Sequence, residues 1–160
     1  MKSKDLVNLM FSPQWVAKLL HYFLSGAQSI SKEGIKTELL YLSLPFIIDD
    51  TTRGKLVSAV KTSTFSTTFQ NNSSLEIKNS LIQKNEQIKQ FHEITNSGII
   101  YLGNIENLKI GSFIVASKTI DYKKEKGISR DYCKAAYYLG VIFAREDYRS
   151  VFVKLGITNI

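Results

Sequence analysis

Three side chains of this sequence could act as a general base or as a nucleophile. They are His21, His92 and Cys133, the two histidines and the single cysteine of the chain. Either chemistry needs a second group that orients the first and exchanges a proton with it. Only Glu93 stands beside His92, and the sequence identifies no base for Cys133. We therefore interpret the histidines as packing or surface residues and Cys133 as structural.

Cys133 lies near the start of the last long helix that the apolar pattern predicts. The helix dipole, Arg130 and Lys134 would favour its thiolate there, although a reactive thiol alone makes no catalytic site. Asp49 and Asp50 could be imagined at a metal site, but two carboxylates before two threonines are more typical of a helix start.

Sequence motifs for enzymatic activity are also lacking. The sequence contains no glycine-rich loop ending in Gly-Lys-Ser/Thr, no nucleophile elbow and no zinc helix with paired histidines. A single cysteine excludes a disulfide scaffold and a multi-cysteine metal site. We therefore expect no catalytic residues, no metal and no cofactor, and we predict that the protein is not an enzyme.

The composition is that of a globular protein with an excess of positive charge. The chain has 160 residues, of which 44% are apolar and 22% are charged, and this predicts one domain over residues 1–160. The net charge of +7 permits an anionic partner. The first residues make no convincing targeting segment, and the most apolar window, 39–48, is shorter than the roughly 20 residues of a membrane span. We expect a cytoplasmic protein without membrane contact.

The N-terminal part, residues 12–60, is predicted to consist of helices. Ser12-Pro13 is a favourable helix start, and apolar residues follow at helical spacing until Ser25-Gly26, where we expect the helix to end. Residues 35–48 are densely apolar, and Pro45 is expected to kink or end a helix there. The acidic and threonine residues 49–52 offer caps for a short helix.

The middle part, residues 73–117, is predicted to form a long helix and a β-hairpin. Ser73 and Glu76 fit a capping box at the start of the helix, and Asn96-Ser97-Gly98 would end it. Residues 99–102 and 108–117 are rich in β-formers and predict the two strands of the hairpin. Before this part, the polar connection 61–72 should place Phe65 and Phe69 on the core.

The C-terminal part, residues 129–156, is predicted to hold two helices. Residues 118–127 look like an exposed loop, Ser129 can cap the longer helix, and Asp147 and Gly156 can delimit a shorter one. The complete pattern predicts an α+β fold that is mostly α-helical, with a winged-helix-like core and one β-hairpin.

Charge is distributed unevenly along the chain. Residues 62–117 carry four positive and four negative side chains, whereas residues 118–160 carry nine positive and five negative ones. A winged helix that reads DNA places a basic helix in the major groove beside a basic wing. The neutral helix and hairpin therefore argue for a protein partner, and a DNA-binding transcription regulator with a winged helix is the alternative.

The best candidate for binding an anion is the basic loop after the hairpin. Its candidate contact residues for DNA or an acidic partner are Lys118, Lys123, Lys124, Lys126 and Arg130. Tyr122 is interleaved with them, and such a cluster can neutralise phosphate groups. The alternative is a solvated loop, because Asp121 and Glu125 reduce the positive excess.

Tyrosines around the last long helix are candidates for a protein interface. Nine Phe, eight Tyr and one Trp are more than a small core readily hides, and aromatic residues are enriched at interfaces. The alternative is that these tyrosines are ordinary half-buried residues. The candidates are Tyr132, Tyr137, Tyr138 and Tyr148.

Several short segments carry a resemblance to a known family. They are the Ser12-Pro13 helix with YFLSGA at 22–27, LYLSLPFII at 40–48, TTR at 51–53, residues 85–95 with Gly98 and Ile99, and AAYYLG at 135–140 through FVKLGI at 152–157. Their order resembles the middle component of three-component ABC (ABC-3C) bacterial conflict systems, which include Lamassu-type anti-phage defence. Where members often have a basic or His-Lys-Pro-like stretch before the Thr-Arg step, this chain has Asp49-Asp50.

This resemblance implies a non-enzymatic accessory subunit with a winged-helix-like core. Such a subunit would lie between an SMC-like ABC ATPase and an effector, often a nuclease, and it could also contact the DNA backbone.

Overall fold

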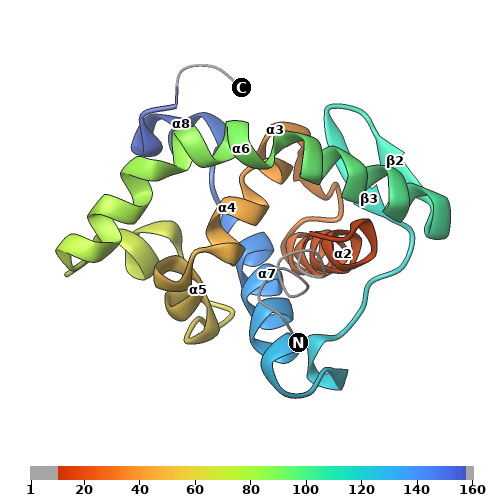
Figure 1. Cartoon of the computed structure of the whole chain (residues 1–160), viewed down its shortest axis with the longest axis horizontal. Helices are drawn as coiled ribbons and strands as arrows, with labels where there is room; N and C mark the ends of the chain where they lie inside the picture. The colour runs from red at the N-terminus through yellow and green to blue at the C-terminus, as the bar shows by residue number, and fades with distance from the viewer. Residues whose placement is uncertain (1–10, 158–160) are drawn as a thin grey trace.

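The computed structural model describes residues 11–157, which form a mostly helical fold with a small antiparallel sheet at one edge (Figure 1). The long helix α6 runs across one side of the molecule, and α2 packs against both α6 and α7. The helices are α2 (Pro13–Ile30), α3 (Thr37–Leu40), α4 (Ser43–Ile48), α5 (Asp50–Val57), α6 (Leu75–Ile105), α7 (Ile128–Ala144) and α8 (Tyr148–Leu155), with the short turns η1 (Ser66–Gln70) and η2 (Tyr122–Lys124).

The sheet has three antiparallel strands in the order β1-β3-β2. Strands β2 (Leu108–Ile110) and β3 (Phe113–Ala116) form a hairpin, and β1 (Ile35–Lys36) pairs with the other edge of β3. A β-hairpin is therefore present, but it lies entirely within residues 108–117, whereas the sequence predicted pairing of 99–102 with 108–117. The strand predicted at residues 99–102 is wrong, because these residues belong to α6 and bury Leu102.

Helix α6 is longer than the sequence pattern indicates. It continues through the predicted end at 96–98 because Gly98 lies against Val16 and Leu20 of α2, where a larger residue would not fit. Its cap also differs by one residue from the prediction. The side chain of Ser74, not that of Ser73, accepts a hydrogen bond from the Ile77 N–H at 3.3 Å.

Helices α2 and α7 cross at two glycines. A Cβ at Gly26 would overlap the main chain of Tyr137, and a Cβ at Gly140 would overlap the main chain of Phe23. The predicted helix end at Ser25-Gly26 is therefore wrong, since α2 continues to Ile30. Here glycine serves the close approach of two helices and not a turn.

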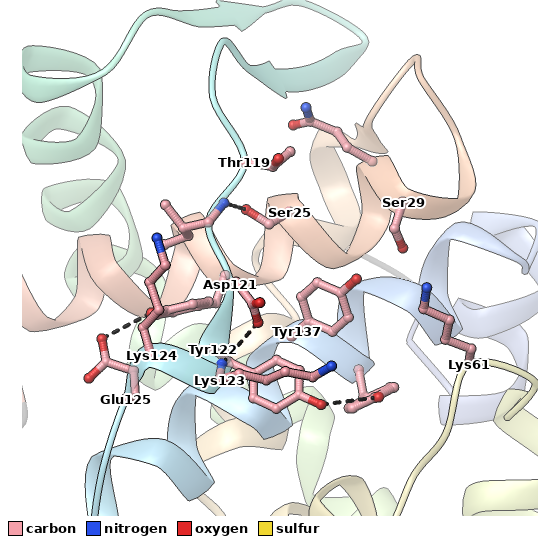
Figure 2. Close-up of a pocket in the computed structure, with 14 residues that line it drawn as sticks. Ser25, Ser29, Lys61, Thr119, Asp121, Tyr122, Lys123, Lys124, Glu125 and Tyr137 are labelled. Atoms are coloured by element: carbon pink, nitrogen blue, oxygen red, sulfur yellow. Dashed lines mark hydrogen bonds between the residues drawn. The ribbon is translucent and has the colours of Figure 1, made fainter.

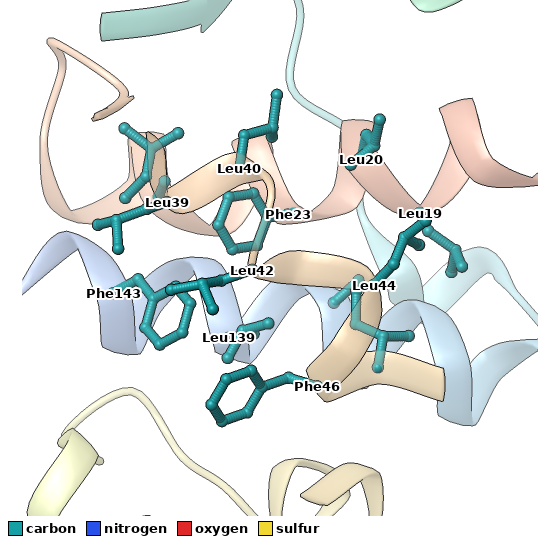
Figure 3. Close-up of a cluster of buried hydrophobic side chains, with 14 of the residues drawn as sticks. Leu19, Leu20, Phe23, Leu39, Leu40, Leu42, Leu44, Phe46, Leu139 and Phe143 are labelled. Atoms are coloured by element: carbon teal, nitrogen blue, oxygen red, sulfur yellow. The ribbon is translucent and has the colours of Figure 1, made fainter. Parts of the chain in front are cut away.

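An aromatic cluster fills the core beside this crossing. Phe46 and Phe143 lie 5.5 Å apart between ring centroids, and Phe65 and Phe69 each pack against Phe46, which confirms that they fold back onto the core. Figure 3 shows Phe46 and Leu42 beside Leu139 and Phe143 of α7. Pro45 lies in the first turn of α4, where a proline needs no N–H partner, so it neither kinks nor ends that helix.

The other helix ends follow local chemistry. The Asp49 carboxylate accepts from the Thr51 N–H at 3.0 Å and begins α5, while Asp147 and Gly156 delimit α8 as predicted. The predicted Ser129 cap is wrong, because α7 begins after Gly127 and the Ser129 hydroxyl donates to the Lys126 carbonyl.

These elements confirm an α+β fold that is mostly helical. The winged-helix-like core is not confirmed. Among residues 11–157, no helix combines the length and the apolar character that crossing a bilayer requires. The first ten residues, where we expect no targeting segment, lie outside the described part of the chain.

Candidate functional site

Helix α2 carries a polar face opposite to its buried apolar stripe. Lys18, His21, Tyr22, Ser25 and Gln28 follow one another at steps of three or one residues, so they share one side of the helix. The last residue of strand β3 and the segment after it, residues 116–125, lie along this side and are held by these residues. We call this segment the basic loop.

Hydrogen bonds from α2 fix the main chain of the basic loop. His21 Nε2 donates to the Lys118 carbonyl at 2.7 Å, and the Ser25 hydroxyl accepts from the Ile120 N–H at 3.0 Å. The Gln28 amide makes two bonds with Ala116, donating to its carbonyl and accepting from its N–H. His21 is therefore a buried packing residue, as the sequence predicts.

Glu125 anchors the far end of the basic loop. Its carboxylate accepts from the Tyr22 hydroxyl at 2.9 Å and pairs with Lys18 at 2.7 Å. Burial alone would raise the pKa of Glu125, but the hydrogen bonds from Lys18 and Tyr22 outweigh it and hold the pKa below its ordinary value. Burial and the bond to Glu125 raise the pKa of Tyr22, which stays neutral.

A cleft of about 670 Å³ opens between the basic loop, α2 and α7 (Figure 2). Lys123 and Lys124 line it from the loop, Tyr137 and Tyr138 line it from α7, and Lys61 reaches it from the connection after α5. The structure thus brings together part of the predicted basic cluster and part of the predicted tyrosine set.

The tyrosines of the cleft form a cluster of three rings. The centroids of Tyr122, Tyr137 and Tyr138 lie 5.3–5.8 Å apart, and the hydroxyls of Tyr122 and Tyr138 are within 3.2 Å. Burial, together with the bond to Tyr122, raises the pKa of Tyr138. The cluster therefore presents neutral rings and hydroxyls to the cleft.

All five predicted basic contact residues are exposed, but only two of them line the cleft. Lys118, Lys126 and Arg130 lie outside its lining. Within residues 11–157, none of the five makes a salt bridge with a carboxylate. Their contact with DNA or an acidic partner stays a prediction.

Sequence reasoning missed Lys61. Its main chain is fixed from α7, because the Arg145 guanidinium donates to the Lys61 carbonyl at 2.5 Å. No local pattern around Lys61 indicates the cleft, since its cleft neighbours come from segments more than 30 residues away along the sequence. Only the tertiary fold reveals this cation.

The other predicted tyrosines lie elsewhere. Tyr132 packs edge-on against Trp15 and lies under the Arg53 guanidinium, 4.2 Å from it. Tyr148 contacts Phe152, and the Lys36 ammonium lies 5.0 Å from its ring. All four predicted tyrosines are half-buried, so their place in a protein interface stays a prediction.

The residues that could do acid–base or nucleophilic chemistry are dispersed. His92 is exposed and stacks on Tyr41 at 4.8 Å between centroids, with Asn96 as its hydrogen-bonding neighbour in place of Glu93. Cys133 is 0% exposed, and burial together with the charge of Glu125 raises its pKa to about 12. The expectation that its surroundings favour the thiolate is therefore wrong, because burial outweighs the nearby cations.

Asp49 belongs to a buried polar network instead of a metal site. One carboxylate oxygen caps α5, and the other accepts from the Ser80 hydroxyl and from the Lys84 ammonium, the latter at 2.7 Å. Lys84 is 0% exposed and also donates to Gln87. Over the described residues, no three His, Cys, Asp or Glu side chains gather where a metal ion could bind.

The structure thus places an anchored loop, exposed cations and a cleft lined by aromatic residues on a mostly helical fold. The chain matches the family model "ABC-three component (ABC-3C) system Middle Component 3" over residues 2–159, and it belongs to that family. This confirms the resemblance to an ABC-3C middle component. No curated protein and no solved structure shows significant similarity to the chain. As a middle component of a multi-subunit system, the protein has the other components of that system as partners.

Proposed function

We propose that the protein is a non-catalytic adaptor of a bacterial anti-phage or anti-plasmid defence complex of the Lamassu type. It bridges an SMC-like ABC ATPase and an effector, often a nuclease, and it contacts DNA through its basic loop. Membership of the ABC-3C middle components over residues 2–159 is the observation that carries this proposal.

The charge distribution supports different roles for different faces. Helix α6 carries equal numbers of acidic and basic side chains, whereas Lys118, Lys123, Lys124, Lys126 and Arg130 are all exposed on or beside the basic loop. Phosphate neutralisation supplies most non-specific affinity for DNA. We therefore assign contact with DNA to the basic loop, and protein contact to the neutral faces.

Exposed apolar side chains support a protein partner on α6. Leu75 and Ile82 are each 73% exposed, and they stand two helical turns apart on one face of its N-terminal half. Burying such side chains against a partner stabilises a complex by about 25 cal/mol per Å² of apolar surface, before the costs of association. We assign this face to one of the two protein partners.

Co-expression with the neighbouring genes tests the adaptor role. The tagged chain is expected to retain an ATPase and an effector through size-exclusion chromatography. Ile82→Glu is expected to release one of them, whereas Gln83→Glu, which adds the same charge at an exposed polar position beside it, should retain both. A chain that stays monomeric beside both neighbours contradicts the proposal. Nanomolar, sequence-specific binding of the isolated chain to its own promoter would indicate a transcription regulator instead.

A further inference from the structure

The cleft offers cations and an aromatic ring to a single ligand. The ammonium groups of Lys61, Lys123 and Lys124 have no carboxylate partner among residues 11–157. In the view of Figure 2, the ring of Tyr137 lies between Lys61 on one side and Lys124 on the other. The cleft therefore presents three cations and an aromatic ring together.

The main chain that carries these lysines is already held in place. His21 and Ser25 bind the basic loop at Lys118 and Ile120, and Arg145 binds the Lys61 carbonyl. Only the lysine side chains remain to be ordered when a ligand arrives. Preorganisation of this kind raises affinity, because less conformational freedom is lost on binding.

The two carboxylates in the cleft are engaged by the protein itself. One oxygen of Asp121 accepts from the Lys123 N–H at 2.9 Å and so caps the η2 turn. Glu125 is paired with Lys18 and accepts from Tyr22. Since Lys18 compensates Glu125, the three free lysines outweigh Asp121, and the cleft favours an anion.

We propose that the cleft binds a nucleotide unit of a single nucleic-acid strand, with the base against the Tyr137 ring and the flanking phosphates on Lys61, Lys123 and Lys124. A nucleotide within a strand has a phosphate on each side of its sugar, which matches several cations around one ring. Aromatic rings with lysines beside them are how proteins hold single strands irrespective of sequence.

The volume of the cleft distinguishes this ligand from its competitors. About 670 Å³ lies within the roughly 300–1,000 Å³ range of small-molecule sites, and it is too small to admit a double helix, which could only lie across the rim. An acidic peptide supplies negative charge but no planar group for the ring. This inference deepens the proposed contact with DNA and rests on that part of the proposed function.

Fluorescence anisotropy with the full-length chain tests the proposal. The probe is a labelled 12-nucleotide oligothymidylate, and the competitors are the same strand in a duplex, thymidine monophosphate and polyglutamate. We expect the single strand to bind at least tenfold more tightly than the duplex. If thymidine monophosphate competes more weakly than the single strand, the ligand is a strand. If the two compete equally, the ligand is a free nucleotide in the same site. Equal binding of the duplex, binding of polyglutamate only, or no binding overturns the proposal.

Matched variants locate the binding. Replacing Lys123 and Lys124 together by Gln is expected to lower the affinity at least tenfold and to flatten its salt dependence, as expected when phosphate contacts are removed. The same exchange at Lys55 and Lys109, which are exposed and lie outside both the basic loop and the cleft, should change the affinity less than threefold. Equal losses in the two double variants overturn the proposal, since they indicate a diffuse charge effect.

The ring is tested with a pair of substitutions that separates stacking from folding. Tyr137→Leu should weaken binding about tenfold because stacking on an aromatic ring is lost, and Tyr137→Phe should retain it within threefold. If the Phe and Leu variants bind alike while both keep the melting temperature of the parent, the proposed stacking is wrong.

This inference and the adaptor role can fail separately. A parent chain that co-purifies with its partners but binds no oligonucleotide would refute this inference alone. Failed co-purification would refute the adaptor role.

Discussion

Gly26 of α2 and Gly140 of α7 lie at one crossing, where each residue faces the main chain of the other helix. The two longest core helices after α6 therefore meet backbone to backbone. The crossing also sets the geometry of the cleft, because Tyr137 of α7 contacts Gly26 and Ser25 of α2 binds the basic loop.

Adding a methyl group at this crossing should destabilise the fold. We expect Gly26→Ala and Gly140→Ala each to lower the free energy of unfolding by about 2–4 kcal/mol, because the overlap is with backbone that cannot move aside easily. Urea denaturation measures the change. Gly54→Ala is the control, since Gly54 is an exposed helical residue with open space around it. It should be neutral or stabilising by up to about 1 kcal/mol, and equal effects at all three positions would contradict the described crossing.

The buried pair of Asp49 and Lys84 should be strongly coupled. Asp49→Asn retains the cap of α5 but leaves the fully buried Lys84 ammonium without its counter-charge, which we expect to cost about 3 kcal/mol. Combining it with Lys84→Met should recover much of that loss, because no buried charge then remains. A double-mutant cycle by urea denaturation gives the coupling. Strictly additive losses would show that the two residues do not interact.

His21 should hold the basic loop against α2. His21→Leu leaves the Lys118 carbonyl without its donor, and such a loss costs about 1–3 kcal/mol locally. We expect trypsin to cleave after the loop lysines at least fivefold faster in this variant, because the loop leaves its anchored position more often. His92→Leu replaces an exposed histidine far from the loop contacts and should leave the cleavage rate unchanged. Equal rates in both variants would argue against the anchor.

Acid should weaken the fold partly through Glu125. Its pKa is lowered in the folded protein, so it stabilises the fold above its ordinary value of 4.5, and this contribution is lost as the pH falls below 4.5 and through the lowered pKa. Glu125→Gln should therefore be less stable than the parent at pH 7, and the difference should shrink by pH 3. Urea midpoints at both values measure it. A gap that stays constant or grows on acidification would show that Glu125 has the opposite linkage.

Local chemistry made several helix ends predictable from the sequence. Asp49, Asp147 and Gly156 each begin or end a helix through contacts with neighbouring residues, and the structure confirms them. The ends predicted at Gly26 and Gly98 are wrong, because a glycine that follows a serine looks like a helix end until the packing partner is known. At both positions a second helix approaches too closely for any other side chain.

The candidate site depended on contacts that no local pattern contains. Lys123 and Lys124 were predicted as part of a basic cluster, and Tyr137 and Tyr138 as part of an interface, but only the fold places the two groups in one cleft. The polar spacing on α2 was the available signal for the anchored loop. Without the position of the loop, however, the same spacing also fits an ordinary solvated helix face.

Omission of this chain from the assembled system is the measurement that tests the bridging role most directly. The ATPase and effector encoded beside it are purified separately, and their association is followed by native mass spectrometry with and without the full-length chain. We predict that the two bind each other only when the chain is added, in one complex that contains all three. Association of the ATPase with the effector in its absence would contradict the bridge, as would a chain that binds neither of them.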